Sequence, residues 1–147
     1  MYKRILVATD GSDLSQKAVT HAIGLAGLCK AEIVVVKVVP RYPQTYFEGS
    51  MSLTESDAER IEAQWAKDSQ AIVDAALQQA TGAGVTAVGK VIKSDVVSDA
   101  LIGTAKDEHA DLIVMSSHGR KGISRLLLGS ETQQVLTHSA IPVLVLR

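Results

Sequence analysis

The chain has 147 residues, of which 15 are Lys or Arg and 16 are Asp or Glu, giving a formal net charge of -1. This length suits one domain over residues 1–147 with a buried core, and the balanced charge argues against a nucleic-acid or membrane surface. The one cysteine, Cys29, excludes an internal disulfide, and no apolar run is long enough to cross a bilayer. We therefore expect a cytoplasmic protein, with Cys29 on the face of a helix that packs in the protein core.

Apolar runs and helical patterns alternate along the chain. Aliphatic and β-branched runs predict strands at residues 5–8, 32–39, 85–92, 111–115 and 141–146. Apolar spacings of three and four predict helices at residues 14–29, from 52 or 56 to 82, 95–109 and 130–138. This alternation predicts an α/β fold, a doubly wound five-stranded parallel sheet in the order 3-2-1-4-5 with helices on both faces.

Several local features of the helices and loops follow from the same patterns. The predicted capping boxes pair Asp13 with Gln16, Ser130 with Gln133, and either Ser52 with Glu55 or Ser56 with Glu59. On the long helix, the stripe of Ile61, Trp65 and Ile72 is expected to pack in the core. Residues 41–52, which include Tyr42, Tyr46 and Phe47, have no clear period and predict a surface loop or a lid.

The stretch from residue 115 to 132 has the composition of a phosphate site. It follows an apolar strand, contains Gly119, Gly122 and Gly129, and leads into a helix that opens at Ser130. Glycines let a backbone approach a ligand closely, and the first N–H groups of a helix favour anions. Three cations lie in the stretch, Arg120, Lys121 and Arg125, and of these we expect Arg120 to contact a ligand.

The predicted topology selects the same part of the chain. In doubly wound sheets, ligands bind beyond the carboxyl ends of the strands where the strand order reverses. With the order 3-2-1-4-5, that reversal lies between the first and fourth strands, which are followed by residues 9–12 and 116–130. Asp10 could then bind a ribose or share a magnesium shell, or it could only form a turn.

The spacing of the glycines is similar to that of the nucleotide-binding type of the universal stress protein family. That pattern has a glycine, two residues, a glycine, nine residues, then glycine with Ser or Thr. Here Gly119, the nine residues 120–128, and Gly129 with Ser130 match it, while Ser116 stands at the first glycine. A position that requires positive φ would strain serine by about 1–2 kcal/mol. The likeness covers essentially the whole chain and implies a Rossmann-like, adenine nucleotide α-hydrolase-like fold.

The resemblance also implies a ligand, ATP with magnesium, and a set of residues that hold it. Adenine and ribose contacts fall on Ala8, Thr9, Asp10, Val38 and Met115. Ribose and phosphate contacts fall on Ser116, Gly119, Gly129, Ser130 and Thr132. Two further residues of the stretch complete the predicted site: His118, which could approach a phosphate, and Glu131, whose carboxylate would compete with a phosphate at the helix start. The family commonly forms homodimers through the last strand, here Ile141 to Leu146.

Three functions from different classes remain open. The first is an ATP-binding regulatory module of the stress response, with slow ATP hydrolysis at most. The second is an ATP-using enzyme, suggested by residues 10–15, although the chain has neither a P-loop nor an S-G-G-x-D-S loop. The third is a nucleotide-free dimer that binds a protein partner because its site has decayed at Ser116. His21, His109 and His138 lack neighbours at metal-ligand spacing and predict no metal site.

Overall fold

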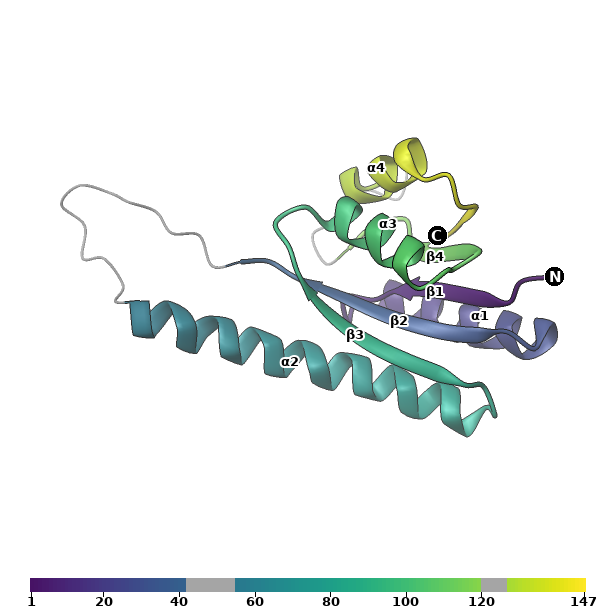
Figure 1. Cartoon of the computed structure of the whole chain (residues 1–147), viewed down its shortest axis with the longest axis horizontal. Helices are drawn as coiled ribbons and strands as arrows, with labels where there is room; N and C mark the ends of the chain where they lie inside the picture. The colour runs from purple at the N-terminus through teal and green to yellow at the C-terminus, as the bar shows by residue number, and fades with distance from the viewer. Residues whose placement is uncertain (42–54, 120–126) are drawn as a thin grey trace.

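The computed structural model describes residues 1–41, 55–119 and 127–147, and these form a five-stranded parallel sheet with helices on both faces (Figure 1). In chain order the elements are β1 (Arg4–Ala8), α1 (Asp13–Cys29), β2 (Glu32–Val39), α2 (Glu55–Gly82), β3 (Ala87–Lys93), α3 (Val97–Asp107), β4 (Leu112–Ser116), α4 (Ser130–His138) and β5 (Val143–Leu146). The sheet order is β3-β2-β1-β4-β5, which confirms the predicted topology. The order reverses between β1 and β4.

The central strands are aliphatic on both faces because helices cover both. Successive side chains of a strand point to opposite faces, so each strand supplies two cores. Val7 and Val35 belong to the core under α1 and α2, whereas Leu6 and Val34 belong to the core under α3 and α4 (Figure 1). Cys29 is partly buried and packs against the first of these cores, in line with its predicted place.

The predicted core face of α2 is wrong at three positions. Ile61, Trp65 and Ile72 are only half-buried, and the buried apolar residues of the helix are Val73, Ala76 and Ala80. A helix of 28 residues is about 42 Å long, whereas the eight residues of β2 span roughly 26 Å. The amino-terminal half of α2 therefore extends past the sheet (Figure 1), and an apolar period alone does not reveal that overhang.

The predicted capping boxes are also wrong where the structure describes them. Ser12, rather than Asp13, caps α1, and its side chain accepts a hydrogen bond from the Ser15 N–H at 3.3 Å. Gly129, rather than Ser130, caps α4, since Ser130 is already the first helical residue.

Two further boundary predictions concern α2 and the segment before it. Because α2 begins at Glu55, Ser56 lies inside the helix and cannot cap it. Ser52 and residues 42–54 in general, which include the predicted lid and its aromatic side chains, lie outside the described residues. Within the described ranges, no helix has both the length and the apolar character needed to cross a membrane.

Candidate functional site

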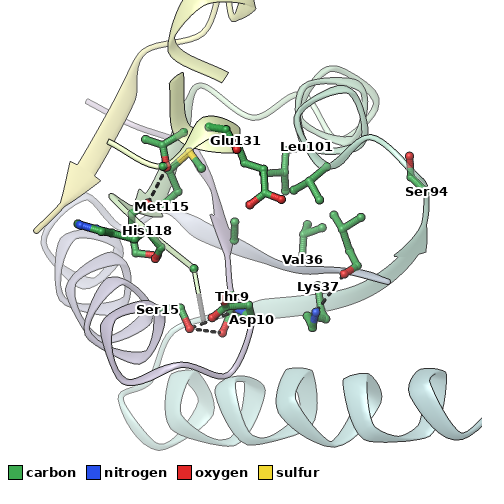
Figure 2. Close-up of a pocket in the computed structure, with 18 of the residues that line it drawn as sticks. Thr9, Asp10, Ser15, Val36, Lys37, Ser94, Leu101, Met115, His118 and Glu131 are labelled. Atoms are coloured by element: carbon green, nitrogen blue, oxygen red, sulfur yellow. Dashed lines mark hydrogen bonds between the residues drawn. The ribbon is translucent and has the colours of Figure 1, made fainter. Parts of the chain in front are cut away.

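A cavity of about 580 Å³ opens at the carboxyl edge of the sheet, where the strand order reverses (Figure 2). This volume falls within the range of roughly 300–1,000 Å³ that is typical of small-molecule sites. The predicted site residues that line it are Ala8, Thr9, Asp10, Val38, Met115, Ser116, His118, Gly119, Gly129, Ser130, Glu131 and Thr132. Arg120 lies outside the described residues. The structure thus brings every described member of the predicted set to one cavity.

The loop after β1 forms one wall and holds Asp10 in a fixed position. The Thr9 N–H donates to the Val36 carbonyl at 3.0 Å, which continues the pairing of β1 with β2. The Asp10 Oδ1 atom accepts the Ser12 N–H at 2.9 Å, and the Asp10 N–H donates to the Ser15 hydroxyl at 3.3 Å. These bonds orient the Asp10 carboxylate at the cavity mouth (Figure 2).

Ser116 occupies the opposite wall as the last residue of β4, not as part of the loop. Its hydroxyl donates to the His118 carbonyl at 2.8 Å, and the neighbouring Ser117 N–H donates to the Leu146 carbonyl at 2.7 Å. Among the described residues, only Lys30 and His109 combine a side chain with positive φ. Ser116 therefore carries no left-handed backbone strain, and the serine at the first glycine position of the motif fits its place.

The two remaining glycines of the motif lie where a side chain would crowd a neighbour. A Cβ atom at Gly119 would lie 2.8 Å from the Asp10 Oδ2 atom. A Cβ atom at Gly129 would lie 3.1 Å from the Ser117 carbonyl oxygen, which also accepts the Gly129 N–H at 2.7 Å. Close approach rather than positive φ explains both glycines, because neither has a positive φ. Gly119 lets the loops after β1 and β4 meet at the cavity, and Gly129 lets the start of α4 approach the end of β4.

The amino terminus of α4 faces the cavity without a capping side chain. Its N-cap, Gly129, offers no side-chain acceptor, so the first-turn N–H groups of the helix are suited to an external anion. The Thr132 hydroxyl is already used within the protein and is not offered to such an anion. It donates to the backbone carbonyls of Ser116 at 3.0 Å and Ser117 at 3.3 Å. Thr132 therefore fixes the start of α4 against the end of β4.

Part of the cavity wall is apolar. Val36, Val38, Leu101 and Met115 are buried there and belong to the core under α3 and α4. Of these, Val36 and Leu101 were not predicted. Val36 could have been found, since it lies two residues before Val38 and must share its face of the strand. Leu101 comes from a helix with no motif, so only the tertiary fold brings it in.

Four polar residues of the lining were also missed: Ser15, Lys37, Ser94 and Asp95. Ser94 and Asp95 follow β3, so their place at the carboxyl edge of the sheet was a usable signal. The Lys37 ammonium donates to the Val38 carbonyl at 3.0 Å, close to the predicted base contact. A lysine inside an aliphatic strand gave no comparable signal.

The remaining predicted residues are His118 and Glu131. The His118 Nδ1 atom shares a hydrogen bond with the Ser117 hydroxyl. Glu131 lies in the first turn of α4, and Figure 2 shows its carboxylate extending into the cavity. In the described part of the chain, no three His, Cys, Asp or Glu side chains gather as they would around a metal ion.

The parallel doubly wound sheet, with its cavity at the reversal of strand order, defines the class of open α/β proteins that bind ligands at the carboxyl edge. Residues 1–147 match the model described as the universal stress protein family. The chain belongs to that family, which confirms the resemblance seen in the glycine spacing.

Individual relatives agree with this assignment. The chain is 33% identical over 147 residues to a universal stress protein of Methanocaldococcus jannaschii, covering 100% of this chain and 83% of the relative. It is 30% identical to the universal stress protein YxiE of Bacillus subtilis, with 100% of both chains covered. Among solved structures, a universal stress protein in complex with cAMP is similar with a TM-score of 0.67 and 28% identity, over 99% of this chain and 97% of that one.

Proposed function

We propose that this protein is a cytoplasmic regulatory module of the stress response that binds an adenine nucleotide in the cavity at the switch point. The observation that carries the proposal is the convergence of the loop after β1, the end of β2, the end of β4 and the start of α4 on one cavity. The ligand expected from the family resemblance is ATP. The relative solved with cAMP supports an adenine nucleotide more generally, because its chain is 28% identical over 99% of this one.

The chemistry of the cavity suits the two ends of a nucleotide. The buried side chains of Val36, Leu101 and Met115 offer an apolar surface for a base. The uncapped start of α4, with Gly129 before it, offers N–H donors for a phosphate. Asp10 lies between these ends on the loop after β1, where its carboxylate is suited to accept ribose hydroxyl hydrogen bonds. Base, sugar and phosphate would thus follow the cavity from its apolar depth to α4.

Magnesium would bind at this site only together with the nucleotide. Asp10 supplies one carboxylate, with its Oδ1 atom already accepting the Ser12 N–H at 2.9 Å. Magnesium is commonly held by one or two carboxylates together with phosphate oxygens and waters. One carboxylate is therefore enough for an ion that arrives with a polyphosphate, and it would offset part of the phosphate charge.

The protein is proposed to act by binding rather than by fast turnover. The sequence has no P-loop lysine to neutralise the β- and γ-phosphates, so ATP hydrolysis would be slow at most. A bound nucleotide would instead favour one arrangement of the loops around the cavity and so change the contacts with a partner.

A homodimer through the last strand is part of the proposal. β5 is the terminal strand of the sheet order, and its residues Val143–Leu146 are half-buried. An edge strand presents unpaired backbone N–H and C=O groups that a second chain can pair with. The stretch from Ile141 to Leu146 would then form the dimer interface.

A calorimetric titration with ATP and with AMP, in the presence of magnesium, tests nucleotide binding. Gly119→Val should reduce the affinity at least tenfold, because a Cβ atom there lies 2.8 Å from the Asp10 Oδ2 atom and the larger side chain would enter the cavity mouth. Gly27→Val is the matched control, since a Cβ at Gly27, on α1, meets nothing within 4 Å. Absence of binding to the wild-type protein at millimolar nucleotide would refute the proposal.

A further inference from the structure

Glu131 places a negative charge beside the proposed phosphate position. It lies in the first turn of α4 and lines the cavity. Helical side chains lean toward the amino terminus of their helix, which directs this one toward the uncapped N–H groups. Figure 2 shows the carboxylate extending into the cavity. Within the described residues it forms no hydrogen bond or ion pair, so its charge is not neutralised by a described partner.

The other described side chains that line the cavity do not cancel the negative charge of Glu131. Besides Glu131, the lining contains the carboxylates of Asp10 and Asp95 and one ammonium group, that of Lys37. The Lys37 ammonium donates to the Val38 carbonyl at 3.0 Å, and Figure 2 shows Lys37 apart from Glu131. Repulsion between like charges grows with the charge of the ligand, and it is stronger at a partly buried site than in bulk water. From the described side chains alone, a ligand with several phosphate groups therefore meets more repulsion than a ligand with one.

We propose that Glu131 is a specificity-determining residue that sets the preference of this cavity for adenine nucleotides with one phosphate group over those with three. The inference rests on the proposed nucleotide-binding function and names the ligand class within it. The α4 terminus attracts the first phosphate of either ligand. The carboxylate of Glu131 then disfavours the additional charges of a triphosphate, which leaves the monophosphate affected less.

The test compares the dissociation constants of AMP and ATP by calorimetry, in buffer with EDTA, for the wild-type protein and Glu131→Gln. Glutamine keeps the shape of the side chain and removes its charge. The comparison therefore measures the effect of the Glu131 charge alone, because the charges of its neighbours are the same in both proteins. Asp99→Asn is the matched control, because Asp99 lies in the first turn of α3 and does not line the cavity. Circular dichroism and thermal melting establish that each variant is folded.

We expect wild-type protein to bind AMP at least as tightly as ATP. Glu131→Gln should strengthen ATP binding by roughly fivefold to tenfold, the size of one like-charge contact under water-like screening, and change AMP binding by less than about twofold. Asp99→Asn should leave both affinities unchanged. Added salt should narrow the difference between the two ligands in the wild-type protein, because it screens the repulsion.

The outcomes separate this inference from the function on which it rests. If both proteins bind nucleotides with the same ratio of ATP to AMP affinity, Glu131 does not set the preference, and the nucleotide-binding function stands. An equal gain for both ligands in Glu131→Gln also overturns the inference, since it indicates general repulsion without selectivity. If neither protein binds AMP or ATP at millimolar concentration, the proposed function itself fails.

Discussion

The attachment of α4 to β4 depends on the hydroxyl group of Thr132. This side chain is 2% exposed, and its Oγ1 atom donates to the carbonyls of Ser116 at 3.0 Å and Ser117 at 3.3 Å. The Ser117 carbonyl also accepts the Gly129 N–H at 2.7 Å, so the start of α4 is bound to the end of β4 at two points. Thr132→Val keeps a branched side chain and removes only the donor.

The expected loss of stability follows from the burial of this group. Removing one partner of a buried hydrogen bond costs about 1–2 kcal/mol, because the remaining carbonyl loses its donor out of reach of water. For a chain of this size, that loss lowers the melting temperature by roughly 3–8 °C. Thr132→Ser keeps the hydroxyl and should retain more of the stability, although it loses the contacts of one buried methyl group.

Urea denaturation measures the free energy of unfolding, and calorimetry on the same samples measures nucleotide affinity. We expect Thr132→Val to unfold at lower urea and to bind AMP several-fold more weakly, since the first turn of α4 is no longer held beside β4. An unfolding free energy within about 0.5 kcal/mol of wild type, the limit for an ordinary surface substitution, would refute this role for the hydroxyl.

Three further outcomes follow from particular contacts. Gly89→Ala should destabilise the protein by about 1–3 kcal/mol in urea, because its Cβ would collide with the Val73 side chain between β3 and α2. The Lys90 ammonium lowers the pKa of the Glu108 carboxyl below its ordinary value of 4.5, so this ion pair stabilises the fold above that pH and is lost as the pH falls through the lowered pKa. Stability measured from pH 6 to pH 3 should fall less steeply in Lys90→Met. Ser116→Gly should change AMP affinity by less than about threefold, because Ser116 has no positive φ to relieve; affinity gained only in the variant would contradict this.

The fold was predictable because its central strands are buried on both faces, which leaves a recognisable pattern in the sequence. Runs such as residues 33–36 are aliphatic without alternation, which indicates parallel strands between helical layers. The boundaries were less predictable. Ser12 and Asp13 are both good N-cap residues, and only the structure shows that Ser12 takes the place. Likewise, the period of α2 includes Ile61 and Trp65, but nothing local indicates that the sheet ends before them.

The candidate site was predictable where residues share a motif or a strand end. Gly119 and Gly129 have a recognisable spacing, and Asp10 follows directly from a buried strand. Leu101 and Lys37 reach the cavity from within a helix and a strand, so their places depend on how the elements pack. Sequence reasoning placed the two loops beside each other at the carboxyl edge of the sheet, where the structure has them, but could not delimit the cavity between them.

The most direct test of the central claim is a titration of the labelled protein with AMP, followed by amide resonances in nuclear magnetic resonance spectra. The amide signals of Asp10, Gly119 and Ser130 should shift together and saturate, because these residues line one cavity. The signals of Lys17 and His21, on the exposed side of α1, should not move. Shifts confined to the α1 surface, or no saturable shifts at millimolar AMP, would contradict a nucleotide site between β1 and β4.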